Sequence, residues 1–189
     1  IISIMRKSVG QRIPEKEITN FQFICERIKK QKFHQEDIKM VGRIYHVGLT
    51  VSDLDRSIAF YRDILGLEFQ GEIFMEGEET DKMFRRANCK ARVAYLNGSK
   101  AIEAPPVELI QFVDNKVNQM QSDLFTTSIS EVCFYTDDID SAYKILIENH
   151  VECLSEPQYF DFRAEGFGES RAFYFRDPDG IILEMMQPL

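Results

Sequence analysis

The sequence lacks any long apolar run. No stretch approaches the roughly 20 apolar residues that a membrane-spanning helix needs, although 44% of the 189 residues are hydrophobic. The first residues also lack the basic-then-apolar order of a secretory signal. We therefore expect a cytoplasmic protein that does not bind a membrane. Because the chain begins with Ile1 and not with Met, we also expect a processed or truncated form.

Cysteine pairs and runs of positive charge are absent as well. The four cysteines, Cys25, Cys89, Cys133 and Cys153, show no C-x-x-C spacing, so they predict reduced thiols and disfavour a structural zinc site. The formal net charge is −8, and Lys and Arg form no long run. Nucleic acid is therefore disfavoured as the main partner.

One pattern occurs twice in the sequence. Residues 45–61 and 130–143 each begin with an alternation of apolar and polar residues, the period of a strand that is covered on one side. Apolar residues at helical spacing follow in both copies. Ser52 and Asp137 stand where each helix needs an N-cap. The chain therefore contains a duplicated strand-helix unit.

The same signals divide the chain into four parts. Residues 1–40 predict a helical extension. Residues 41–114 and 129–189 predict two modules, each with a strand, a helix and then three strands, and residues 115–128 connect them. The N-terminal helix either packs on a sheet or meets a partner chain, so a homodimer remains an alternative.

Three segments interrupt the strand patterns. Residues 76–81 are charged and predict a mobile loop in the first module, whereas residues 177–180, Asp-Pro-Asp-Gly, predict a tight turn before the last strand. Residues 157–169 are aromatic and contain glycines near one end. That segment predicts either a lid over a cleft or a hairpin extension with no role in binding.

Four ionisable residues hold matched positions in the two modules. The first strands carry His46 and Glu131, and the last strands carry Glu108 and Glu184. Alternation points each away from the helix-covered face, so the four converge if the two sheets curve around a common cleft. Each residue alone is explained as a solvated polar group, but their coincidence in a repeat favours a metal site. One imidazole and three carboxylates suit Mg²⁺, Mn²⁺, Fe²⁺, Co²⁺, Ni²⁺ or Zn²⁺.

Arginine and aromatic side chains are candidates for contact with the substrate. The arginines either hold an anionic substrate group or form surface ion pairs, and the aromatic residues either line the cleft or pack in the core. The candidates are Arg92, Arg171, Tyr95, Phe173 and Phe162.

Several segments resemble the vicinal oxygen chelate superfamily, which includes glyoxalase I, methylmalonyl-CoA epimerase, extradiol dioxygenases and the fosfomycin and bleomycin resistance proteins. The resemblance covers residues 43–188. It implies an α+β fold of paired βαβββ modules, whose mostly antiparallel sheet forms a U around a central cleft; the N-terminal helix is then an extra element. The similar segments are 46–57, 60–61, 65–67, 175–180 and 183–184.

The resemblance also implies a ligand set and a reaction. It places metal ligands at the four matched residues, with Glu131 where the most similar members carry His. Dioxygenases and fosfomycin-modifying enzymes use two His ligands, whereas glyoxalase I and the epimerase combine His with carboxylates or amides, which is closer to this set. We therefore expect a metal-dependent lyase or isomerase that abstracts a proton next to a metal-bound carbonyl of a small substrate. Glu184 is the expected base and Glu131 its partner.

Two alternatives remain within the same superfamily. One is a binding protein of the bleomycin-resistance type, which sequesters a small molecule without metal, and the other is a dioxygenase. A binding protein is expected to replace several ligand residues by apolar ones, and none of the four is apolar here. The enzyme interpretation is therefore preferred.

Overall fold

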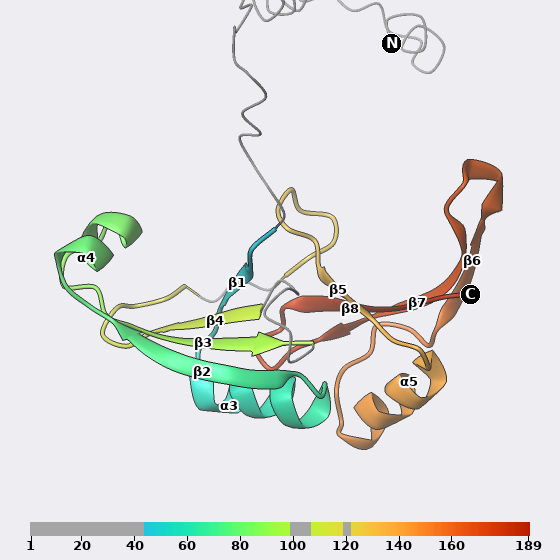
Figure 1. The fold of residues 1–189 in the computed structure, drawn as a ribbon, viewed down its shortest axis with the longest axis horizontal. Helices are drawn as coiled ribbons and strands as arrows, with labels where there is room; N and C mark the ends of the chain where they lie inside the picture. Colours follow the sequence, from blue (N-terminus) through green and yellow to red (C-terminus); the bar gives the residue numbers. More distant parts are fainter. Residues whose placement is uncertain (1–43, 99–106, 119–121) are drawn as a thin grey trace, which may run out of the picture. The chain divides into compact units, whose positions relative to one another are not determined.

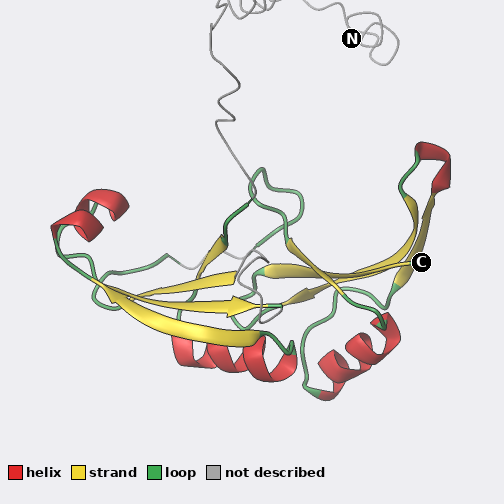
Figure 2. Cartoon of the chain, in the orientation of Figure 1, coloured by secondary structure: helices red, strands yellow, loops and turns green. Residues whose placement is uncertain are grey.

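The computed structural model describes residues 44–98, 107–118 and 122–189. Two mixed four-stranded sheets with helices make up this part (Figures 1 and 2), which confirms the expected α+β class. The predicted helical extension at residues 1–40 lies outside the described residues. Within the described ranges, no helix is long and apolar enough to cross a membrane.

The first module has the predicted order of a strand, a helix and three strands, with one further helix. Its sheet runs β1-β4-β3-β2, with β1 parallel to β4 and the other pairs antiparallel. Helix α3 continues into a wider π-helical turn at Phe60–Ile64. The elements are β1 (Val47–Thr50), α3 (Leu54–Ala59), β2 (Glu68–Met75), α4 (Glu78–Phe84), β3 (Ala91–Asn97) and β4 (Val107–Phe112).

The second module repeats this topology. Its sheet runs β5-β8-β7-β6, and only the β5–β8 pair among these strands is parallel. Helices α3 and α5 lie on the same side of the two sheets (Figure 2). The paired βαβββ modules are thus confirmed. The elements are β5 (Val132–Tyr135), α5 (Ile139–Glu148), β6 (Gln158–Phe162), a 3-10 turn (Arg163–Glu165), β7 (Gly168–Arg176) and β8 (Ile182–Pro188).

Both module helices begin one residue later than the sequence predicts. The carboxylates of Asp53 and Asp138 accept hydrogen bonds from backbone N–H groups in the first turn, as N-caps do. The expected caps have other partners: the Ser52 hydroxyl donates to Asp179, and Asp137 accepts from the Tyr135 hydroxyl. The prediction of Ser52 and Asp137 as caps is therefore wrong.

Helix α4 replaces the mobile loop predicted at residues 76–81. Gly77 precedes the helix with a φ of 98°, a left-handed conformation that favours glycine. The Asp81 carboxylate accepts the N–H groups of Asn88 and Cys89 at 2.9 and 2.7 Å, which closes the following loop. The Phe84 ring packs edge-on against a ring of β4. These contacts order a helix too short to give an apolar stripe.

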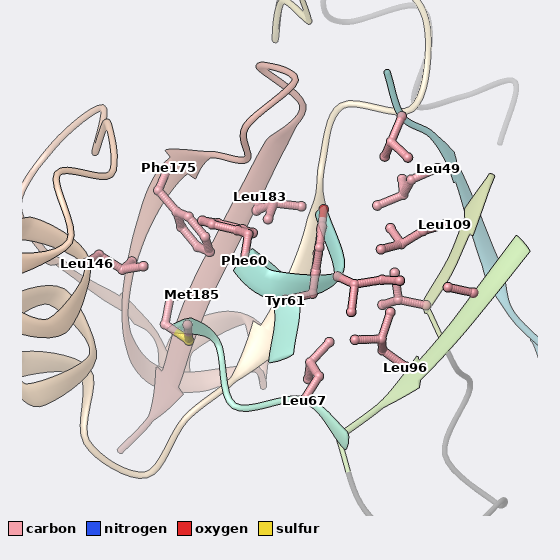
Figure 3. Close-up of a cluster of buried hydrophobic side chains, with 14 of the residues drawn as sticks. Leu49, Phe60, Tyr61, Leu67, Leu96, Leu109, Leu146, Phe175, Leu183 and Met185 are labelled. Atoms are coloured by element: carbon pink, nitrogen blue, oxygen red, sulfur yellow. The ribbon is translucent and has the colours of Figure 1, made fainter. Parts of the chain in front are cut away.

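The core lies between the helices and the sheets, and one cluster of buried side chains includes residues of both modules (Figure 3). Leu54, Tyr61 and Leu109 of the first module are fully buried, as are Phe175 and Leu183 of the second. Leu109 and Leu183 thus lie on the helix side of the last strands, as the predicted alternation requires. Their chain neighbours Glu108 and Glu184 consequently face the opposite side.

The predicted turn at residues 177–180 joins the two modules. Asp177 is 5% exposed, and its carboxylate accepts the Tyr61 hydroxyl at 3.1 Å and the N–H groups of Asp179 and Ile181 at 2.9 and 2.8 Å. Asp179 in turn accepts the Arg56 guanidinium at 2.8 Å. The turn at residues 177–180 of the second module therefore contacts helix α3 and the π-helical turn of the first module.

Candidate functional site

Glu108 lies on the sheet face opposite helix α3. In the strand register, Gly48 of β1 and Tyr95 of β3 stand opposite Glu108 on its two sides. A Cβ atom at Gly48 would lie 3.1 Å from Oε2 of Glu108. The carboxylate therefore extends over β1, and the lack of a side chain at Gly48 leaves space for it.

His46, Tyr95 and Glu108 form what we call the first half-site. His46 Nε2 lies 3.4 Å from Glu108 Oε2, and the Tyr95 hydroxyl donates to Glu108 Oε1 at 2.9 Å. Burial raises the pKa of Tyr95 to about 12, and the hydrogen bond to Glu108 adds to this rise. The hydroxyl therefore remains a donor at physiological pH, and it orients a carboxylate that also contacts an imidazole.

The second half-site consists of Glu131, Cys133, Tyr174 and Glu184. Cys133 and Tyr174 stand opposite Glu184 in the register, as Gly48 and Tyr95 stand opposite Glu108. Burial raises the pKa of the Cys133 thiol to about 12, aided by its hydrogen bond to Glu184 and by the charges of Glu184 and Glu131. Burial also raises the pKa of Tyr174, again with both glutamates contributing.

Sequence reasoning missed Cys133 and Tyr174 as site residues. Signals for both exist in the duplicated pattern: Cys133 follows Glu131 by two residues, which keeps it on the same strand face, and Tyr174 follows Arg171 as Tyr95 follows Arg92. Cross-strand register makes the equivalence explicit, because it brings each tyrosine beside the glutamate of the last strand.

The four predicted ligands are not all in contact. His46 and Glu108 lie together, and Glu131 and Glu184 both act on Cys133. In residues 44–98, 107–118 and 122–189, no group of three or more His, Cys, Asp or Glu side chains could hold a metal ion as placed. The residues fit a divalent cation by donor chemistry, imidazole nitrogen with carboxylate oxygen. Their role as ligands stays a prediction.

Arg92 and Arg171 lie on the other face of the sheets. Arg92 donates to Asp55, in the first turn of α3, at 2.8 Å and to Glu72 at 2.7 Å. Arg171 donates to Asp140, in the first turn of α5, at 2.6 and 2.7 Å. The ion-pair alternative thus describes both arginines, and the structure does not bring them to the half-sites.

Phe173 also lies on the helix side. It is 3% exposed, and its ring meets the ring of Tyr143 in α5 edge-on, with the centroids 5.3 Å apart. Phe173 is therefore a core residue in this structure, and we leave it out of the proposed site together with the two arginines.

Phe162 lies on the same face as the second half-site. In the β6–β7 pair, Phe160 stands opposite Ser170 and Phe162 opposite Gly168, and cross-strand partners share a face. Ser170 and Tyr174 are four residues apart on β7, so they point to the same side. Phe160 and Phe162 stack with ring centroids 5.9 Å apart and remain 40% and 47% exposed. Two apolar rings are thus available on this face.

Comparison with known proteins identifies the family. Residues 43–185 match the model of the Glyoxalase/Bleomycin resistance protein/Dioxygenase superfamily. YaeR of Escherichia coli is 28% identical over 145 residues, which cover 77% of this chain and 95% of YaeR. Mitochondrial methylmalonyl-CoA epimerase of Mus musculus is 25% identical over 149 residues, which cover 78% of this chain and 74% of the epimerase.

Solved structures agree with this assignment at the level of the fold. A glyoxalase family protein from Bacillus cereus gives a TM-score of 0.69 at 21% identity, covering 82% of this chain and 99% of that protein. The trypanothione-dependent glyoxalase I of Leishmania major gives 0.52 at 19% identity, covering 78% and 87%. The family match spans most of the chain and confirms the resemblance seen in the sequence. The chain belongs to the glyoxalase/bleomycin resistance protein/dioxygenase superfamily.

Proposed function

We propose that the chain is a metal-dependent lyase or isomerase that removes a proton next to a carbonyl of a small substrate. The observation that supports this most is the pair of matched half-sites, in which a glutamate of the last strand lies beside a tyrosine on the sheet face opposite helix α3 or α5. Similarity to methylmalonyl-CoA epimerase favours the same reaction class.

The proposal gives each side chain a role. His46, Glu108 and Glu131 would hold the metal, together with Glu184 until it acts as the base. A bound divalent ion supplies a Lewis acid that polarises the substrate carbonyl. Glu184 takes the proton from the adjacent carbon onto a carboxylate oxygen and returns it to the substrate carbon skeleton in a later step.

A hydrogen-bond donor lies beside each carboxylate of the last strands. The Tyr95 hydroxyl donates to Glu108, and the Cys133 thiol stands opposite Glu184 in the strand register. A donor to the base carboxylate fixes the direction of its free oxygen, which helps a proton transfer that depends on geometry. Phe160 and Phe162 contribute apolar surface on the side of the second half-site.

Exchange of the unusual ligand tests the metal part of this proposal. We expect Glu131→His to shift the metal preference towards the nitrogen-favouring ions Ni²⁺ and Zn²⁺, because it replaces a carboxylate oxygen by an imidazole nitrogen. Metal-free wild-type and variant proteins are titrated with Mn²⁺, Co²⁺, Ni²⁺ and Zn²⁺, and the dissociation constants are compared.

The matched control is Glu156→His, which adds an imidazole at an exposed residue outside both half-sites. An order of affinities in Glu131→His equal to that of the wild type and of the control would show that Glu131 does not reach the metal. The same shift in metal preference in both variants would mean that a histidine added anywhere recruits the ion. That result would also count against Glu131 as a metal ligand.

A second candidate function is metal-free binding of a small molecule, as in bleomycin resistance proteins. It is favoured by the separation of the candidate ligands, since no three of them cluster in the part of the chain that the structure describes. A thermal unfolding midpoint that ignores all four added ions would favour this candidate over the enzyme.

A further inference from the structure

A cavity of about 400 Å³ opens at the first module. It lies between β1, β4 and the segment that follows α4. Its wall includes Thr50, Phe84, Arg86, Cys89, Phe112 and Lys116.

The cavity lies on the same sheet face as the first half-site. Thr50 follows Gly48 by two residues on β1, and Phe112 follows Glu108 by four residues on β4, so both point to the side of the Glu108 carboxylate. Ile110 lies between Glu108 and Phe112 on β4, and its side chain would be 3.6 Å from a Cβ atom at Gly48. Because each residue of a strand adds about 3.3 Å, Phe112 lies about 13 Å from Glu108 along β4.

The wall combines apolar surface with positive charge. The rings of Phe84 and Phe112 meet edge-on with centroids 5.1 Å apart, and the Cys89 side chain is buried. Arg86 and Lys116 supply the charge, and no carboxylate is among the described residues that line the cavity. Such a site accepts the anionic end of a molecule whose remainder is apolar.

The two cations have no carboxylate partner among the residues that the structure describes. Arg86 donates to the backbone oxygen of Lys116 at 3.3 Å, and neither side chain takes part in an ion pair there. Arg92 and Arg171, by contrast, each bind a carboxylate. Asp81 is the nearby carboxylate, and it is engaged by two backbone N–H groups. In a chain with a net charge of −8, two cations that form no ion pair in the described residues favour an anionic ligand at this cavity.

A cavity of about 670 Å³ between the modules lacks this selectivity. It lies beside helix α3, on the other side of the sheets, and its wall carries both signs of charge, with Arg56 and Arg176 next to Asp63 and Glu152. An anion there meets attraction and repulsion together. The smaller cavity is therefore the better candidate.

We propose that the cavity at Arg86 and Lys116 is the subsite for the anionic end of the substrate. The inference rests on the proposed function and adds the substrate class: an extended molecule that carries a carboxylate or phosphate at the end remote from the reacting carbon, with an apolar segment next to that anion. Arg86 and Lys116 bind the anion, and Phe84 and Phe112 contact the apolar segment.

Binding of an anionic aromatic dye tests the subsite without metal or turnover. The metal-free protein is titrated with 8-anilinonaphthalene-1-sulfonate, and the fluorescence of the dye gives Kd. We expect Arg86→Gln combined with Lys116→Gln to raise Kd at least tenfold. The matched control is Lys82→Gln with Lys144→Gln, which removes the same charge from two exposed lysines outside the cavity and should leave Kd unchanged.

Further arms keep the test decisive. Thr50→Glu places a carboxylate in the wall and should weaken dye binding as much as the double variant, while circular dichroism verifies the fold. Competition by inorganic phosphate and by acetate identifies the preferred anion. Equal Kd values in wild type and both cavity variants overturn the subsite and leave the proposed function standing. Conversely, if the cavity variants raise the Kd of the dye in a protein that is found to bind no metal, this result supports the subsite and excludes the proposed reaction.

Discussion

Glu184→Gln should lower the exchange of the substrate proton with solvent deuterium by about 10²- to 10⁴-fold, the range that general-base catalysis typically contributes. The amide keeps an oxygen beside Cys133 and Tyr174, but it cannot take up the proton. Exchange should therefore fall much further than metal occupancy. Proton NMR in heavy water measures it on a panel of 2-hydroxy acids, 2-oxo acids, hemithioacetals and branched acyl thioesters.

Exchange is the right quantity because a base that returns the proton in place exchanges it even where net turnover is slow. Glu148→Gln serves as the control, since this exposed residue of α5 pairs with Lys144 outside both half-sites. Wild-type exchange that survives in Glu184→Gln would exclude Glu184 as the base. No exchange on any compound, by protein shown to hold metal, would favour oxygen activation or sequestration instead.

The second large effect concerns stability and is expected at Asp177, whose carboxylate contacts both modules. We expect Asp177→Ala to lower the free energy of unfolding by about 2–3 kcal/mol, because it leaves buried donors without an acceptor. These donors are the Tyr61 hydroxyl and two backbone N–H groups of the turn. Urea unfolding followed by circular dichroism gives the value. Tyr61→Phe removes only one of the three bonds and should cost about 1 kcal/mol.

Asp177→Asn separates the hydrogen bonds from the charge. Burial raises the pKa of the Asp177 carboxyl above its usual range. The folded state therefore binds this proton more tightly than the unfolded state, so the ionised carboxyl costs stability at neutral pH. That cost disappears as the pH falls through the raised pKa. In Asp177→Asn, the free energy of unfolding should therefore not rise as the pH falls through this range. If Asp177→Asn is as unstable as Asp177→Ala, the assigned hydrogen bonds are contradicted.

The faces of Glu108 and Glu184 could be predicted because they follow from local alternation. Leu109 and Leu183 are fully buried on the helix side, and a strand turns adjacent residues to opposite faces. The same rule argues against Arg92 as a site residue: it is three residues from Tyr95, so the two cannot share a face. Arg92 instead pairs with Asp55 and Glu72 on the helix side.

Other features depend on contacts that a linear pattern does not contain. The partnership of Cys133 and Tyr174 with Glu184 requires the pairing of β5, β8 and β7. The loop after helix α4 is closed by Asp81, which accepts two N–H groups seven and eight residues further on. How closely the half-sites approach each other depends on the packing of two modules across the Asp177 joint, which alternation within each strand does not specify.

Elemental analysis of protein purified without added metal tests the central claim most directly. The account predicts about one divalent ion per chain, because a single site with a few protein ligands holds one ion. His46→Ala should lose this ion, and the control Lys144→Ala should retain it. Wild-type protein that holds no divalent ion, and whose thermal unfolding midpoint does not change with added Mn²⁺, Co²⁺, Ni²⁺ or Zn²⁺, would contradict it.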